Sequence, residues 1–233
     1  FEFYEDFAIA DVGDWTLTDV DLKVTYGFNG LTFPNSGVAK SFQVFNSTQT
    51  LNSTTQVVTP MTPSATSDWS GRSGQRAMVC FAAASATPLN NDWLISPQMT
   101  LGSTGNTVSF WAKSCDATYG LERFKVGVST TGVAPANFTI VSPGAYVVTP
   151  ANVTYVQYTY NLDAYAGQNV YIGINCVSND QFGFAVDDFL VTATALGTEG
   201  FFASNFAVYP NPASNVLNIN TKNNNAINQV QIT

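Results

Sequence analysis

Adjacent acidic residues offer the clearest chemistry in this chain. Asp187 and Asp188 stand side by side inside the otherwise apolar run of residues 182–192, FGFAVDDFLVT. Because successive side chains on a strand point to opposite faces, at least one of these carboxylates faces apolar neighbours. A carboxylate there is costly unless it is paired, and a hard cation held by several oxygens keeps it ionised. The pair therefore indicates either a metal site or a strand end where both carboxylates reach water.

Further carboxylates occur in other parts of the chain, with Glu5 and Asp6 near the start, a DxD pair at Asp19 and Asp21, and Asp92 before an apolar run. The first and last strands of a β-sandwich usually neighbour one another, so we expect these groups to meet at one rim of the fold. Carboxylate oxygens are the ligands that calcium prefers. We predict a structural calcium ion whose ligands come from Glu5, Asp6, Asp19, Asp21, Asp92, Asp187 and Asp188.

The sequence contains no histidine. The chain by itself therefore cannot build a Ser-His-Asp or Cys-His nucleophile system, nor a zinc site that uses histidine. Two carboxylates could still hydrolyse a glycosidic bond. Because Asp187 and Asp188 are expected on opposite faces, we predict a non-catalytic protein. The alternatives are a carboxylate-dependent glycoside hydrolase and the accessory domain of a secreted hydrolase.

Three cysteines, Cys80, Cys115 and Cys176, each lie in or beside a strand-like run. Free Cys behaves as a small buried hydrophobe, whereas an oxidising compartment favours disulfides. The sequence therefore leaves two arrangements open, three buried free thiols or one disulfide with one thiol left over.

Composition indicates a packed protein that does not bind nucleic acid. Of the 233 residues, 45% are hydrophobic and only 10% are charged, which argues against disorder. The formal net charge is −8 and no basic cluster is present, so a phosphate backbone finds no cationic surface. No apolar run is long enough to span a membrane. The first residues lack the pattern of a signal peptide, so we expect a mature or trimmed chain.

Short runs rich in Val, Ile, Tyr, Phe and Thr, separated by Gly, Pro and Asn clusters, predict about nine or ten strands and no long helix. We expect an all-β fold, a jelly-roll sandwich of two antiparallel sheets. Residues 29–73 are predicted to form long loops at one end of it. The expected strands are 1–7, 16–22, 39–45, 76–83, 90–101, 107–114, 124–130, 155–162, 169–177 and 182–192.

The composition of the chain changes after residue 194, where a short run of small residues follows the last apolar strand. We divide the chain into a jelly-roll domain at 1–194, a linker at 195–204 and an incomplete second β-unit at 205–233, whose two strands cannot bury a core alone. The VYPNP turn followed by a strand that ends in LNI resembles the opening of the C-terminal sorting domain of type IX secretion cargo. This resemblance implies a truncated sorting domain and recognition by the outer-membrane translocon.

Several motifs of residues 1–194 resemble the cleaved-adhesin and choice-of-anchor jelly-roll modules. They are EDF at 5–7, TDVD at 18–21, DWLISP at 92–97, VSFWAKS at 108–114, ERFKVGVSTTG at 122–132 and FAVDDFLV at 184–191. The resemblance implies a secreted or cell-surface adhesin-like module, often with calcium near the sheet ends. Many relatives carry an acidic residue directly after the early Phe, whereas Ala8 follows Phe7 here, so an N-terminal ligand must come from Glu5, Asp6 or a backbone carbonyl.

Binding of a surface glycan or protein requires exposed side chains, and aromatic residues on loops are the usual anchors. We expect Trp69, Tyr119 and Tyr146 to serve this purpose. The sequence leaves glycan and protein ligands equally open.

Overall fold

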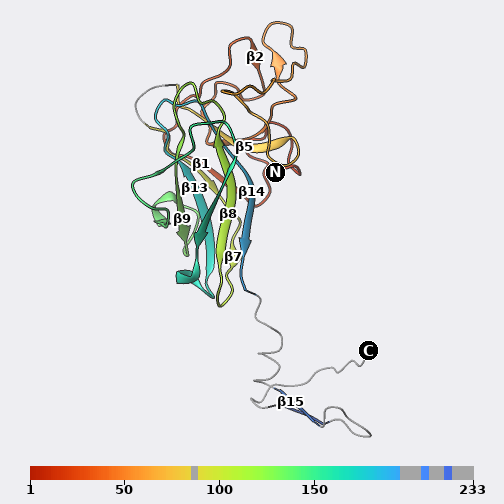
Figure 1. Ribbon diagram of the computed structural model, residues 1–233, viewed down its shortest axis with the longest axis vertical. Coiled ribbons are helices and arrows are strands. Elements are labelled where there is room, and N and C mark those ends of the chain that lie inside the picture. The colour runs from red at the N-terminus through yellow and green to blue at the C-terminus, as the bar shows by residue number, and fades with distance from the viewer. Residues whose placement is uncertain (85–88, 195–205, 210–217, 222–233) are drawn as a thin grey trace.

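The computed structural model describes residues 1–84, 89–194, 206–209 and 218–221. Its strands form two main antiparallel sheets. Figure 1 shows their strands running roughly along the long axis of the molecule, with long loops gathered at the end that carries β2. The all-β prediction is confirmed, because two short 3-10 helices are the only helices in the described ranges.

One sheet has seven strands in the order β1-β6-β13-β9-β10, with β11 also paired to β9 and β7 to β13. The second has five strands in the order β12-β8-β14-β5-β3. The seven-stranded sheet comprises β1 (Thr16–Asp19), β6 (Asp92–Ile95), β7 (Met99–Thr100), β9 (Arg123–Ser129), β10 (Thr139–Ile140), β11 (Val147–Val148) and β13 (Asn169–Cys176). The five-stranded sheet comprises β3 (Phe42–Asn46), β5 (Arg76–Phe81), β8 (Thr107–Ser114), β12 (Val156–Asn161) and β14 (Gly183–Thr192).

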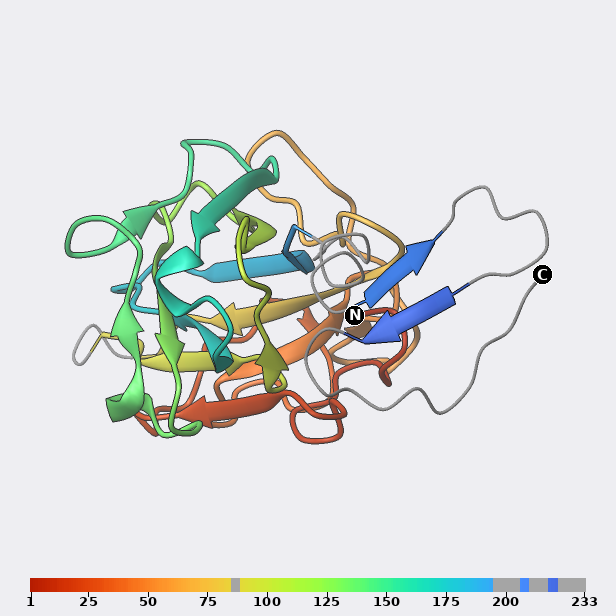
Figure 2. The same ribbon diagram turned by 90° about the horizontal axis from the view of Figure 1, so that it is seen from below.

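The remaining elements are short. A small pair, β2 (Leu31–Thr32) and β4 (Leu51–Asn52), lies among the long loops. The 3-10 helices are η1 (Pro135–Asn137) and η2 (Asp163–Tyr165). Figure 2 shows β15 (Phe206–Tyr209) and β16 (Asn218–Thr221) as adjacent antiparallel strands. The predicted linker and most of the predicted sorting unit lie outside the described residues.

The main hydrophobic core lies between the two large sheets. Alternate residues of the facing strands enter it, as the sequence period predicts, for example Val126 of β9 and Ile174 of β13 against Phe110 of β8 and Phe184 of β14. Because each of these side chains is fully buried, the alternation fixes which face of each strand points outward.

A second core covers the outer face of the five-stranded sheet. Along β5, Met78 enters the main core whereas Val79 and Phe81 point the other way and are also fully buried. They pack with Phe33 and Trp69, which come from the long loops of residues 29–73. These loops therefore bury apolar area on a sheet that is hydrophobic on both faces, a role that their polar composition did not indicate.

Two predictions about the chain ends are wrong. Residues 1–7 form turns instead of a first strand, although the Phe7 N–H donates to the Val44 carbonyl of β3 at 2.8 Å. The first and last strands of the sandwich are also not neighbours, because β1 pairs with β6 whereas β14 pairs with β8 and β5.

Candidate functional site

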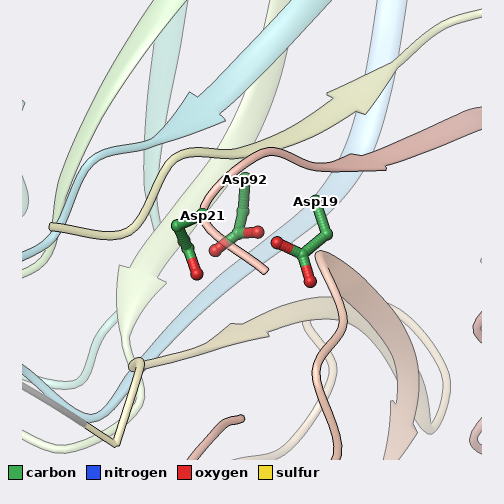
Figure 3. A group of neighbouring side chains, drawn as sticks. All are labelled: Asp19, Asp21 and Asp92. Carbon is green, nitrogen blue, oxygen red and sulfur yellow. The ribbon is translucent and has the colours of Figure 1, made fainter. Parts of the chain in front are cut away.

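Three of the predicted metal ligands come together. Asp19, Asp21 and Asp92 each place a carboxylate oxygen within 4.8 Å of the others, and Figure 3 shows Asp92 between the other two. Strand pairing causes this meeting, since Asp19 ends β1 directly opposite Asp92 at the start of β6. The chain turns immediately after β1, where Leu22 adopts a φ of 55°, and the turn keeps Asp21 beside the pair.

The protein leaves part of this cluster without hydrogen bonds. Asp92 is almost fully buried, and while its Oδ2 accepts from Asn90 Nδ2 at 2.9 Å, its Oδ1 has no partner. Asp19 accepts from the Leu22 N–H, and Asp21 accepts from the Asn91 N–H at 2.8 Å. An unpaired carboxylate oxygen beside two further carboxylates is a donor set suited to a hard cation.

Burial and the proximity of the carboxylates raise the pKa values of two members of the cluster. Burial, followed by the nearby Asp21 charge, raises the pKa of Asp92 to about 8. Burial also raises the pKa of Asp19. The Lys40 charge partly offsets the rise at Asp19. Lys40 Nζ donates to Thr25 Oγ1 and the Asn35 carbonyl, and burial lowers the pKa of Lys40 to about 8.

The other four predicted ligands do not join this cluster, nor any other such group of three in the described residues. Glu5 is exposed. Asp6 accepts from Arg76 Nε at 2.6 Å and from Asn46 Nδ2 at 3.0 Å, so a guanidinium already neutralises it. The expectation that all these carboxylates share one rim is therefore corrected.

Asp187 and Asp188 have protein partners of their own. The Asp187 carboxylate is buried and accepts the N–H groups of Arg72 and Ser73, whereas Asp188 binds the Arg72 guanidinium and the Ser73 hydroxyl. The simple alternation predicted for residues 182–192 fails here, because Asp188 has a φ of 48° and the pairing with β8 shifts register between Asp187 and Leu190. The bulge lets both carboxylates hold one loop.

A groove of about 850 Å³ lies on the outer face of the seven-stranded sheet. Trp93, Asn175 and Lys125 form its floor and stand in register across the adjacent strands β6, β13 and β9. Their neighbours Leu94, Ile174 and Val126 point into the main core, so the floor residues must point outward. Cross-strand neighbours on one face lie about 5 Å apart, which makes this row continuous.

Aromatic rings and glycine shape the groove. The rings of Trp93 and Phe138 lie 4.9 Å apart between centroids. Gly173 of β13 makes room for them, because a Cβ there would stand 2.8 Å from the Trp93 ring and 2.9 Å from the Phe138 ring. Tyr146 lines the same groove, and its ring packs against the Arg123 guanidinium at 4.9 Å.

Polar side chains also line the groove. Asn175 is only 5% exposed and its Oδ1 has no hydrogen-bond partner, whereas Asn91 Oδ1 accepts from Trp93 Nε1 at 3.0 Å. Asp21 is the one acidic side chain among the described residues that line the groove, and it also belongs to the carboxylate cluster. The groove and the cluster are therefore neighbours that share a residue.

The three predicted ligand-binding aromatics have different surroundings. Trp69 is 3% exposed and belongs to the second core, so its prediction as a surface anchor is corrected. Tyr119 is 61% exposed and lines a separate pocket of about 570 Å³ with Tyr26, Phe28 and Asp180. Tyr146 is 40% exposed and lies in the groove. Sequence reasoning missed Trp93, Phe138, Arg123, Lys125, Asn91 and Asn175.

Cys80, Cys115 and Cys176 are all buried free thiols, so the disulfide alternative is excluded in this structure. Burial raises the pKa of Cys80 and that of Cys115, which makes both thiols poor nucleophiles.

Within the described ranges, no helix has the length and apolar character needed to cross a bilayer.

Comparisons with known proteins agree with this architecture. Lys-gingipain W83 of Porphyromonas gingivalis is 28% identical over 138 residues, which cover 52% of this chain and 8% of that protein. The crystal structures of the K1 and K3 cleaved adhesin domains of Lys-gingipain from the same organism superpose with TM-scores of 0.52 and 0.50 at 18% and 19% identity. The superpositions cover 78% and 77% of this chain, and 92% and 89% of those domains.

The family described as Cleaved Adhesin Domain matches residues 39–172, a segment that runs from β3 into β13 and carries most of the groove. Since this match spans more than half of the chain and contributes strands to both large sheets, the chain belongs to the cleaved adhesin domain family.

Proposed function

We propose that this chain is an extracellular, non-catalytic adhesin module that binds carbohydrate in the groove over β6, β13 and β9. The observation that carries the proposal is the row of Trp93, Asn175 and Lys125 on the groove floor, flanked by Phe138 and Tyr146. Aromatic rings pack against the C–H faces of sugars, and amide and charged groups bond to their hydroxyls. The family name, and the sequence resemblance of residues 1–194 to cleaved-adhesin modules, support a binding role outside the cell.

The groove is a poor catalytic centre for the chemistry open to this chain. Glycoside hydrolysis uses a pair of carboxylates, about 5 to 10 Å apart, that flank the bond. Asp21 is the single acid on the described lining, and Asp187 and Asp188 hold the loop at Arg72. We therefore propose binding without cleavage, and the hydrolase alternative predicts release of reducing ends from a bound oligosaccharide.

The Asp19, Asp21 and Asp92 cluster is proposed to hold a structural calcium ion. The donor set fits, because the cluster supplies carboxylate oxygens and one of them, Asp92 Oδ1, has no other partner. Calcium bound there would neutralise the mutual repulsion of the three side chains and fix the start of β6. Export by type IX secretion, with residues 205–233 recognised by the translocon, is proposed from the sequence resemblance alone.

A protein ligand is the second candidate, at the separate pocket beside Tyr119. Its lining combines Tyr26, Phe28 and Phe182 with the Asp180 carboxylate, which suits an apolar or cationic side chain of a partner protein. This pocket lies on the loops instead of the sheet, so the two candidates can be separated by mutation.

A glycan array probed with the purified chain tests the proposal. We expect Tyr146→Ala to weaken binding of the captured glycans by about fivefold or more, since stacking of a ring is worth about 1 kcal/mol or more. Tyr119→Ala is the matched control, because it removes an exposed tyrosine outside the groove. Equal loss in both variants, or loss only in Tyr119→Ala, would contradict the assignment of the groove.

A further inference from the structure

The basic residues of this acidic chain are distributed unevenly. Seven of its eight Lys and Arg residues lie in the described ranges, the exception being Lys222. Three of the seven are neutralised by carboxylates, in the pairs Arg72–Asp188, Arg76–Asp6 and Lys113–Asp68. Lys40 is buried and bonded to Thr25 and Asn35. Lys23, Arg123 and Lys125 remain, and none of them forms an ion pair with a described residue.

Two of these three cations lie together in the groove. Arg123 and Lys125 are two residues apart on β9, and both line the groove, so they project from one face of the sheet. The acid on the same lining, Asp21, already accepts the backbone N–H groups of Lys23 and Asn91. A chain with a net charge of −8 thus presents two unpaired cations in its candidate binding groove. Such a concentration of positive charge attracts anions.

The groove floor also carries a hydrogen-bond acceptor without a partner. Asn175 stands between Trp93 and Lys125, and its buried Oδ1 has no donor. A simple inorganic anion offers oxygens to Arg123 and Lys125 but no donor to Asn175. A sugar that carries a carboxylate offers a hydroxyl as donor and a charged group as acceptor, together with an apolar face for Tyr146.

We infer that the groove selects carbohydrates that bear a carboxylate, such as uronates or sialates, and that Arg123 and Lys125 determine this preference. The inference rests on the proposed carbohydrate-binding function. Tyr146 holds the Arg123 guanidinium by its ring, so the cation is partly ordered before the ligand arrives. Charge-assisted hydrogen bonds are roughly twice as strong as neutral ones, so we expect acidic sugars to bind about tenfold or more tightly than their neutral counterparts.

Matched ligand pairs test this inference. Affinities are measured by calorimetry, at about 0.15 M salt, where charges beyond ~8 Å are screened. The pairs are trigalacturonate against its methyl ester, and a sialylated trisaccharide against the same glycan without sialic acid. A sulfated oligosaccharide forms a third arm. Binding of the sulfated sugar as tight as that of the carboxylated one would overturn the carboxylate assignment in favour of general anion recognition.

Protein variants complete the test. We expect Arg123→Gln and Lys125→Gln each to lower affinity for the acidic member at least fivefold and to leave the neutral member unchanged. Lys23→Gln, which removes an unpaired cation outside the groove lining, should change neither affinity. If neutral and acidic members bind equally to the unaltered chain, the inference is wrong while the proposed function stands. If the array and all these sugars show no binding, both are wrong.

Discussion

Replacing Asp92 by Asn should have opposite effects on stability with and without calcium. In chelator at a pH above 8, where Asp92 is ionised, its Oδ1 is buried without a donor and faces two further carboxylates. An Asn side chain keeps an oxygen for the Asn90 amide and offers its own N–H groups to Asp19 or Asp21. Because an unsatisfied buried polar atom costs about 1 to 3 kcal/mol, we expect the variant to be more stable than the unaltered chain by roughly that free energy of unfolding.

Calcium should reverse this order. An ion that binds only the folded state adds about 2.7 kcal/mol at a hundredfold excess over its dissociation constant. One kcal/mol shifts the melting temperature of a domain of this size by about 2 to 4 °C, so calcium should raise the Tm of the unaltered chain by about 5 to 10 °C. The variant lacks one carboxylate ligand and should gain much less.

Thermal unfolding followed by circular dichroism gives the Tm of the unaltered chain and of the Asp92 variant, each in excess calcium and in excess chelator. Asp11→Asn is the control, because Asp11 is exposed and lies outside the cluster. The same calcium-dependent shift in the Asp92 variant as in the unaltered chain would refute the site. No shift in the unaltered chain would refute the calcium assignment, while a less stable variant in chelator would refute the reading of Asp92 Oδ1 as unsatisfied.

Three further predictions concern the packed interior. Burial raises the pKa of Glu122 from 4.5 to about 7, so the folded state retains a proton that the unfolded state releases. The contribution of Glu122 to stability should therefore fall by about 3 kcal/mol as the pH rises from 4.5 to 7, and Glu122→Gln should remove this part of the pH dependence in urea titrations; an unchanged slope would contradict it. Gly173→Ala should cost about 1 to 3 kcal/mol, because its Cβ would collide with Trp93 and Phe138, and an unchanged urea midpoint would show that the rings can move. Thiol titration should detect no reactive cysteine in the native chain and three in denaturant, whereas a lower count in denaturant would indicate a disulfide.

Strand periodicity was sufficient to predict the main core. The alternation along β9 and β13 assigned Val126 and Ile174 to the interior correctly, because one face of each strand is buried and the other is not. The alternation rule could not predict which side chains of β5 or β14 are buried. Both faces of β5 are buried, and the bulge at Asp188 changes the phase of β14. Neither feature leaves a period-two signal.

Pairing between distant strands determines which site residues meet. Local sequence patterns do not show which strands pair or in what register. Asp19 and Asp92 meet because β1 pairs with β6, although they are 73 positions apart. Predicting the groove would need the register of β6, β13 and β9, because that register aligns the three floor residues. Nothing local to Lys125 in the sequence shows that Trp93 and Asn175 stand beside it. Trp69 was misplaced because its burial depends on loops that fold back over the sheet.

The residues at the start of β6 connect the two candidate sites. Asp92 faces the carboxylate cluster, whereas its neighbours Asn91 and Trp93 line the groove, with Asn91 accepting the Trp93 indole N–H. The Asn91 N–H in turn donates to Asp21, and Asn90 donates to Asp92. An ion at the cluster would therefore hold the segment that positions the groove aromatics. Such a division suits a binding module, because the binding face stays rigid on paired strands.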